Sequence, residues 1–159
     1  MSDKYWKLVE PVWDRISIYG GDETFLRQFA EATEKQRVLF ASHWAQSEIM
    51  NGGLGQFFSN DTGVLAPEAA TAFEKLGMPN CANILRKSMQ FFGASYPRDR
   101  CTREQRFESF HKQFGEEAIP LLELEDAIAV EIEEENGGFW DAAKRAKTPP
   151  AKSPSNPDP

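Results

Sequence analysis

The sequence predicts an all-α protein, a compact single-domain bundle of about seven or eight short helices with a disordered, Pro-rich C-terminal tail. Apolar residues recur every three or four positions along most of the 159 residues, which is the period of amphipathic helices. No segment shows the two-residue alternation and β-branched enrichment of a strand. The 40% hydrophobic and 12% aromatic content is sufficient for one packed core.

The first half of the chain predicts three helices. Apolar residues at helical spacing over 5–16 indicate an amphipathic helix, with Pro11 at a kink or boundary. After Gly20-Gly21, Asp22 is placed to cap a short helix. A longer apolar pattern over 38–50 indicates a third helix, which Gly52-Gly53 end.

The second half predicts four or five more helices. Pro67 and Gly77 mark the start and end of one of them. Asn80 is expected to cap the next helix, and Gly93 closes it. A further helix spans about 102–114, and the last helical region runs from Glu116 past Glu131, with an extra turn at Phe139-Trp140.

The C-terminal tail, TPPAKSPSNPDP, contains five prolines and no large apolar residue. Such a segment buries too little surface to offset its ordering entropy. We therefore expect a helical domain over 1–147 and a disordered tail over 148–159.

Composition narrows the class of protein. The N-terminus lacks a secretory pattern, and no run of about 18 apolar residues is present, so a cytoplasmic protein is expected. A net charge of −7 disfavours direct binding to nucleic acid or to an anionic membrane. Cys81 and Cys101 lack zinc-ligand spacing, and neither a metal nor a cofactor is predicted.

The segment NGGLGQFFSN after residue 50 has two interpretations. In the structural one, its glycines permit a sharp helix reversal, its phenylalanines anchor the turn, and its amides satisfy backbone groups. In the functional one, Asn51, Gln56 and Asn60 surround a polar pocket of an enzyme or small-ligand binder. A phosphate-binding loop is a poor fit, because the segment has no following Lys-Ser or Lys-Thr.

A motif in the middle of the chain is distinctive. Its residues are Glu48, Asn51, Gly52, Gly53, Gln56, Phe57, Phe58 and Asn60. With this motif, the stretch from Trp44 to Gly93 resembles the bacterial DNA-mimic-protein family, long catalogued as a domain of unknown function. Gly55 stands where that family has a polar residue. The resemblance implies an all-helical fold and, for some members, mimicry of DNA.

An acidic run is the second feature with a functional reading. Between Glu116 and Glu135 the chain has nine acids and no Lys or Arg. Leu121, Leu122, Leu124, Ile128 and Ile132 are predicted to face the core. Such a run is ordinarily interpreted as a solvated helix face. In a DNA mimic, the same carboxylates would instead contact a basic partner. The predicted partner-binding residues are Glu123, Glu125, Asp126, Glu131, Glu133, Glu134 and Glu135.

A basic segment opposes that reading. Residues 86–112 contain five arginines and two lysines against three acids. We expect these cations to pair with the acidic helix, either within the fold or across a homodimer.

Candidate catalytic residues are few. His43 precedes Ser47 by one helical turn, but no acid orients it. His111 is isolated, and Cys81 has no nearby base. Each is interpreted as a structural or surface residue, and no catalytic residue is predicted.

The leading hypothesis is a non-enzymatic protein-binding module whose acidic helix engages a basic partner, such as a transcription factor or another DNA-binding protein. The polar-pocket ligand binder or enzyme is one alternative. An immunity- or antitoxin-like protein is another alternative. It would bind its partner through the same acidic surface, so the sequence does not distinguish it from the leading hypothesis.

Overall fold

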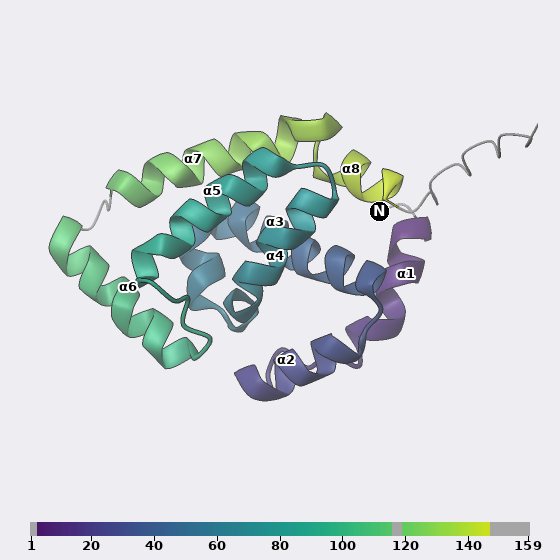
Figure 1. The fold of residues 1–159 in the computed structure, drawn as a ribbon, viewed down its shortest axis with the longest axis horizontal. Helices are drawn as coiled ribbons and strands as arrows, with labels where there is room; N and C mark the ends of the chain where they lie inside the picture. Colours follow the sequence, from purple (N-terminus) through teal and green to yellow (C-terminus); the bar gives the residue numbers. More distant parts are fainter. Residues whose placement is uncertain (1–2, 116–118, 147–159) are drawn as a thin grey trace, which may run out of the picture.

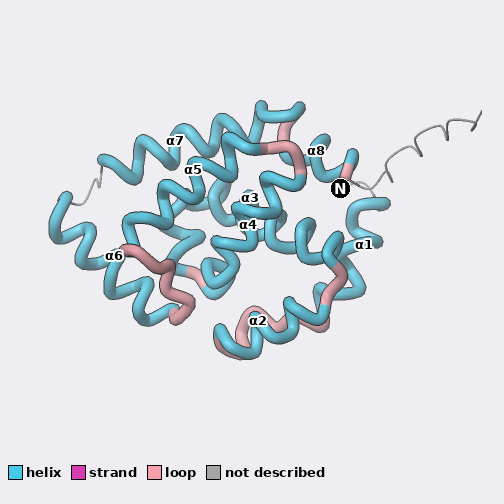
Figure 2. Tube along the Cα trace, viewed as in Figure 1, coloured by secondary structure: helices cyan, strands magenta, loops and turns pink. Residues whose placement is uncertain are grey.

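A computed structural model of the chain describes residues 3–115 and 119–146. Within these two ranges it contains eight α-helices, three short 3-10 helices and no strand (Figure 2). The prediction of an all-α bundle with seven or eight helices is confirmed. The predicted disordered tail and the first two acids of the acidic run, Glu116 and Glu117, lie outside the described residues.

The first four helices follow the predicted order. They are α1 (Asp3–Trp13), which contains Pro11, α2 (Asp22–Glu31), α3 (Glu34–Ser59) and α4 (Ala66–Lys75). A 3-10 helix, η1 (Asp61–Leu65), joins α3 to α4. Pro67 lies in the first turn of α4 and Gly77 follows its end with a φ of 72°, as the Pro-in, Gly-out pattern predicts.

The remaining elements are α5 (Pro79–Met89), η2 (Gln90–Phe92), α6 (Arg100–Phe114), α7 (Ile119–Glu134), η3 (Glu135–Gly137) and α8 (Phe139–Arg145). Helices α3 and α4 occupy the middle of the molecule (Figure 1). Helices α5 and α7 pack side by side along one edge, α6 closes one end, α1 lies at the other end, and α2 runs along the edge opposite α7.

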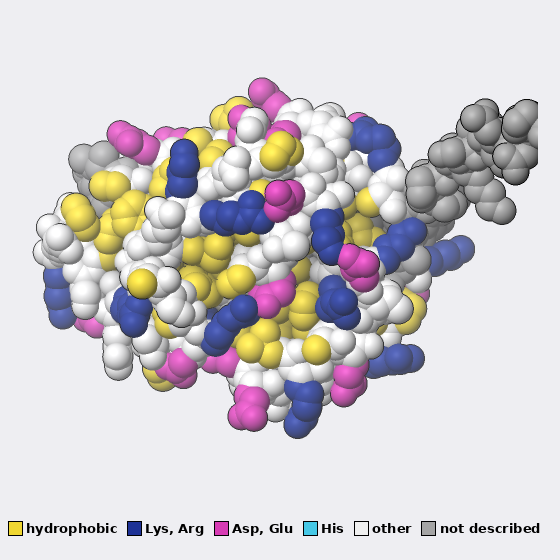
Figure 3. Space-filling model, viewed as in Figure 1, with side chains coloured by type: hydrophobic (Ala, Val, Ile, Leu, Met, Phe, Trp, Pro, Cys, Tyr) yellow, Lys and Arg dark blue, Asp and Glu magenta, His cyan; other side chains and the backbone are white. Residues whose placement is uncertain are grey.

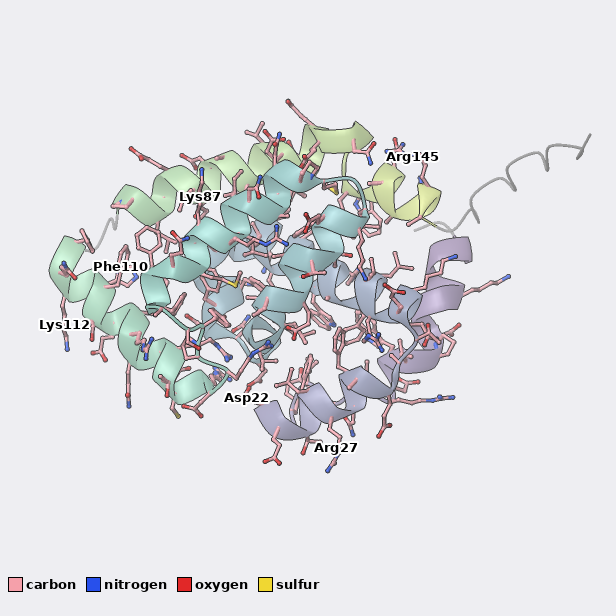
Figure 4. The ribbon with its side chains drawn as sticks, viewed as in Figure 1. Asp22, Arg27, Lys87, Phe110, Lys112 and Arg145 are labelled. Carbon is pink, nitrogen blue, oxygen red and sulfur yellow. The ribbon has the colours of Figure 1, made fainter. Side chains whose placement is uncertain are left out.

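One hydrophobic core extends through all eight α-helices. Its centre is formed by phenylalanines from successive elements: Phe40, Phe57 and Phe58 of α3, and Phe73 of α4. Phe110 of α6 is buried at the end of the bundle beneath α7, so the core extends to that end (Figure 4). None of the helices described is long and apolar enough to cross a membrane.

Two predicted helix caps are wrong. The residue before α5 is Met78 rather than Asn80, and the N–H groups of Asn80 and Cys81 donate to the carboxylate of Glu135. Asp22 lies inside α2, which begins after Gly21 without a side-chain cap, and the Asp22 carboxylate accepts the N–H of Arg100 at the start of α6. The first turns of α5 and α6 thus each receive a carboxylate from another element.

Helix α3 is broken where the sequence predicts its end. Gly52 leaves the helical region with φ −148°, and Gly53 has φ 81° and ψ −179°, a backbone region that is essentially restricted to glycine. The chain then resumes a short helical segment over 54–59, which we call the corner helix. A Cβ atom on Gly53 would overlap the carboxylate of Glu125 from α7.

This packing predicts different costs for two glycine substitutions. Gly115 has nearly the same backbone conformation as Gly53, with φ 84° and ψ 174°, but a Cβ there meets nothing within 4 Å. Gly115→Ala measures backbone strain alone, about 1–3 kcal/mol. Gly53→Ala also displaces Glu125. In urea unfolding, its free energy of unfolding should therefore fall by at least about 2 kcal/mol more than that of Gly115→Ala. Equal losses would contradict the packing at Gly53.

Candidate functional site

The family motif forms a hydrogen-bond network around one carboxylate. Glu48 accepts hydrogen bonds from Gln56 Nε2 at 2.6 Å, Asn60 Nδ2 at 2.8 Å and Thr62 Oγ1 at 3.4 Å. The Asn51 amide in turn donates to Gln56 Oε1 at 3.5 Å. The amides of the motif therefore point toward Glu48 and hold α3, the corner helix and η1 together.

The same network bears on the polar-pocket alternative. A ligand site needs convergent polar groups that line an open cavity. Here Gln56 and Asn60 donate to a glutamate of the same chain, and Phe57 and Phe58 are fully buried beneath them. Four hollows that the described residues form are lined by other side chains. These observations favour a structural role for the motif.

Both ends of the corner helix are bonded by charged side chains from distant helices. Glu125 Oε2 of α7 accepts the N–H of Leu54 at 2.8 Å, at the positive end of the corner helix. Arg103 of α6 donates to the carbonyls of Phe58 at 3.0 Å and Asn60 at 3.1 Å, at its negative end. The corner helix thereby ties α6 and α7 to the centre of the fold.

Arg103 is fully buried, which sequence reasoning missed by assigning it to the basic surface. Its guanidinium also donates to the carbonyls of Pro97 and Arg98, so main-chain oxygens surround it. A signal was present in the sequence: Arg103, Phe107 and Phe110 follow one another at intervals of four and three residues. That spacing places Arg103 on the apolar face of α6.

Three other arginines of the basic segment pair within the fold, but with different acids from those predicted. Arg98 forms a bidentate ion pair with Glu68, at 2.7 and 2.9 Å. Arg86 pairs with Glu74, and Arg100 pairs with Asp61 and Glu104. No ion pair joins this segment to α7 within the described part of the chain, so the prediction of intramolecular pairing with the acidic helix is wrong.

Helix α7 buries a narrower apolar face than predicted. Leu121, Ile128 and Ile132 are buried in the core and Leu124 packs against it, as expected. Leu122 is exposed, so its assignment to the core is wrong. Its position lies about a quarter-turn around the helix from that of Leu121, toward the solvent side.

The seven predicted partner-binding acids fall into two groups. Glu125, Glu131 and Glu135 face inward and are half-buried. Glu135 accepts the N–H groups of Asn80 at 2.7 Å and Cys81 at 2.9 Å, and Glu131 accepts the Asn80 side chain at 3.2 Å. These three carboxylates support neighbouring helices and are committed to the fold.

The other four acids, Glu123, Asp126, Glu133 and Glu134, are exposed, and none of them bonds to another described residue. We call these four residues the acidic stripe. Acidic side chains gather along the edge that α7 forms (Figure 3). Glu123 and Glu133 are about 15 Å apart along the helix axis, and Val130, half exposed, lies between them.

The candidate catalytic residues have structural surroundings. His43 is 8% exposed and packs among the rings of Trp13, Trp44 and Trp140. Burial lowers the pKa of His43, so its imidazole is neutral at pH 7. Burial, and then the neighbouring Glu135, raise the pKa of the Cys81 thiol, which disfavours the reactive thiolate.

Comparison with known protein families agrees with the resemblance of the motif. The family model of the DMP19-like proteins matches residues 30–146, most of the chain. The chain therefore belongs to the DMP19-like family, the DNA-mimic family that the stretch from Trp44 to Gly93 resembles. No curated protein and no solved structure matches the chain.

The division of the acids on α7 predicts unequal costs for two substitutions on one helix. Glu125→Ala leaves the Leu54 N–H without its acceptor and should lower the free energy of unfolding by about 1–3 kcal/mol. Glu123→Ala, its exposed neighbour, should change it by less than about 0.5 kcal/mol. Chemical denaturation measures both. A loss at Glu123 as large as that at Glu125 would contradict the assignment.

The environment of His43 predicts a pH dependence of stability. Its folded pKa lies below the ordinary value of 6.5, so the unfolded chain binds a proton first as pH falls. The contribution of neutral His43 to the free energy of unfolding is complete above pH 6.5. It declines between 6.5 and the folded pKa, by at most about 1.4 kcal/mol per pH unit. Unfolding measured from pH 7.5 to 5.5 should show this decline.

Two variants isolate the contribution of His43. His43→Phe keeps an aromatic ring among the tryptophans and should flatten the pH dependence. His111→Phe, on the other side of the molecule's core in α6, should retain it. An unchanged slope in His43→Phe would show that another group is responsible.

Proposed function

We propose that this protein is a non-enzymatic binding module that presents the acidic stripe of α7 to the DNA-binding surface of a basic partner protein. One observation carries the proposal: four neighbouring carboxylates on one helix are exposed and bonded to nothing else in the described chain. Carboxylates that serve only the fold, such as Glu48, Glu125 and Glu135, have their partners within it.

The spacing of the stripe supports recognition by a surface that binds phosphates. Glu123 and Asp126 are separated by about 4.5 Å along the axis of α7. Successive phosphates of one DNA strand are separated by about 3.4 Å along the axis of the duplex. The family membership supports the same proposal. The basic segment is compatible with it, because all five of its arginines are occupied by carboxylates or carbonyls elsewhere in the fold.

The test neutralises the stripe without touching the acids that support the fold. The variant Glu123→Gln/Asp126→Asn/Glu133→Gln/Glu134→Gln removes four exposed charges. A matched control is Glu10→Gln/Asp14→Asn/Glu23→Gln/Glu31→Gln. It removes four exposed charges from α1, from the residue that follows α1 and from α2, and it changes the net charge equally. Unfolding measurements should place both within about 1 kcal/mol of the parent.

Affinity capture from an extract of the native host then compares the three proteins. We expect the parent and the control to retain a DNA-binding protein and the stripe variant to lose it. Because the contact is between charges, raised salt should weaken it steeply, and added duplex DNA should displace the captured protein. Equal loss in the control, or retention of the partner in excess DNA, would contradict mimicry.

A further inference from the structure

A hollow of about 470 Å³ opens at the C-terminal end of α7, where the chain turns through η3 into α8. Three elements line it: Gln46 and Met50 of α3, Ile132 and Glu133 of α7, and the segment 137–141. Glu133 belongs to both the acidic stripe and this hollow. The stripe therefore leads into a cavity large enough to enclose a side chain of a partner.

The walls of the hollow combine a buried base with an exposed aromatic edge. Ile132 and Phe139 are buried, whereas Met50 and Trp140 are each 41% exposed. The Trp140 ring is held in place, with its centroid 5.3 Å from that of Phe139 and 6.0 Å from that of His43. A fixed, exposed indole is the best aromatic surface for stacking a cation.

The charges of the hollow are negative. Glu133 and Asp141 line it, and none of its nine lining residues is a lysine or arginine. Lys144 lies 3.6 Å from Asp141, but both side chains are half exposed, so this ion pair is weak. Arg145, at the end of α8 next to α7 (Figure 4), donates to the carbonyl of Asn136. Among the described residues, Glu133 thus has no compensating cation.

A comparison with the other hollows singles this one out. The hollow between α2, α3 and α4 is lined by Glu34 and Lys75, which pair with one another, and by Glu68, which pairs with Arg98 outside the hollow. The hollow beside Trp13 and Trp44 has a single carboxylate, Asp14, and lies away from α7. Only the hollow at Trp140, of these three, joins an aromatic wall to two carboxylates and to the acidic stripe.

We propose that this hollow binds an arginine side chain of the basic partner, an inference that rests on the proposed function and deepens it. The guanidinium stacks on Trp140 between the carboxylates of Glu133 and Asp141, and its aliphatic stem packs on Met50 and Ile132. Arginine suits the site better than lysine, because its planar group stacks on rings, binds carboxylates in a bidentate manner and is less strongly hydrated. Buried aromatic–arginine contacts commonly dominate the energy of an interface.

The test uses a capped amino acid in place of the partner. The full-length ¹⁵N-labelled chain is titrated with Nα-acetyl-arginine amide, and with the matching citrulline derivative as a neutral isostere. The chain has four tryptophans, so its spectrum offers four indole N–H signals. We expect arginine to shift the Trp140 indole and the Gly138 amide selectively, and citrulline to shift neither. The lysine derivative should bind more weakly than arginine.

Charge variants test the assignment from both directions. Glu133→Gln and Asp141→Asn should each raise the dissociation constant for arginine about three- to tenfold. Lys144→Gln frees Asp141 from its ion pair and should lower it. Asp14→Asn, at the hollow beside Trp13, serves as the control and should leave it unchanged. All four side chains are exposed, so the variants should fold.

Three results would overturn the assignment: equal shifts with citrulline, equal shifts of all four indoles, or affinity that Glu133→Gln and Asp141→Asn leave unchanged. The titration needs no partner, so its failure leaves the stripe proposal standing. If arginine binds but the stripe variant still captures its partner in excess DNA, the proposed function fails and the arginine site remains.

Discussion

The fold depends on the way the six-residue corner helix is held at both of its ends. A helical segment of this length is unstable on its own, because nucleation costs more than so few hydrogen bonds return. Glu125 supplies a carboxylate at its start and Arg103 a guanidinium at its end, and Glu48 binds the amides that flank it. Glu125 and Arg103 each oppose the partial charge of the helix end that they contact.

This arrangement explains why the acids of α7 do not act as one surface. A carboxylate at a helix N-terminus gains hydrogen bonds to main-chain N–H groups. Glu125 of α7 supplies one to the corner helix, and Glu135 of η3, directly after α7, supplies one to α5. Both side chains are half-buried and face inward. The acids at other angles are left exposed, and the stripe consists of these.

The helices and their order were predictable from the sequence, because apolar spacing, prolines and glycines are local signals. The break at Gly52-Gly53 and the 67–77 helix are examples. The partners of charged groups were not predictable, since Asn80 and Glu135 are 55 residues apart and only tertiary packing joins them. Local signals therefore predicted Asn80 as the cap of α5. They also placed Arg103 among the cations of the basic segment, although it lies on the same face of α6 as Phe107 and Phe110 and is buried.

The same distinction separates two kinds of acid that composition treats alike. A charge run read from the sequence gives nine equivalent carboxylates between Glu116 and Glu135. Among those that the structure describes, three have fixed donors and four do not. Fixed carboxylates have already exchanged water for hydrogen bonds within the protein, so they have less to gain from a cationic partner. The exposed four retain that capacity, and with Trp140 and Met50 at their end they combine charge with an apolar contact, which charge alone does not provide.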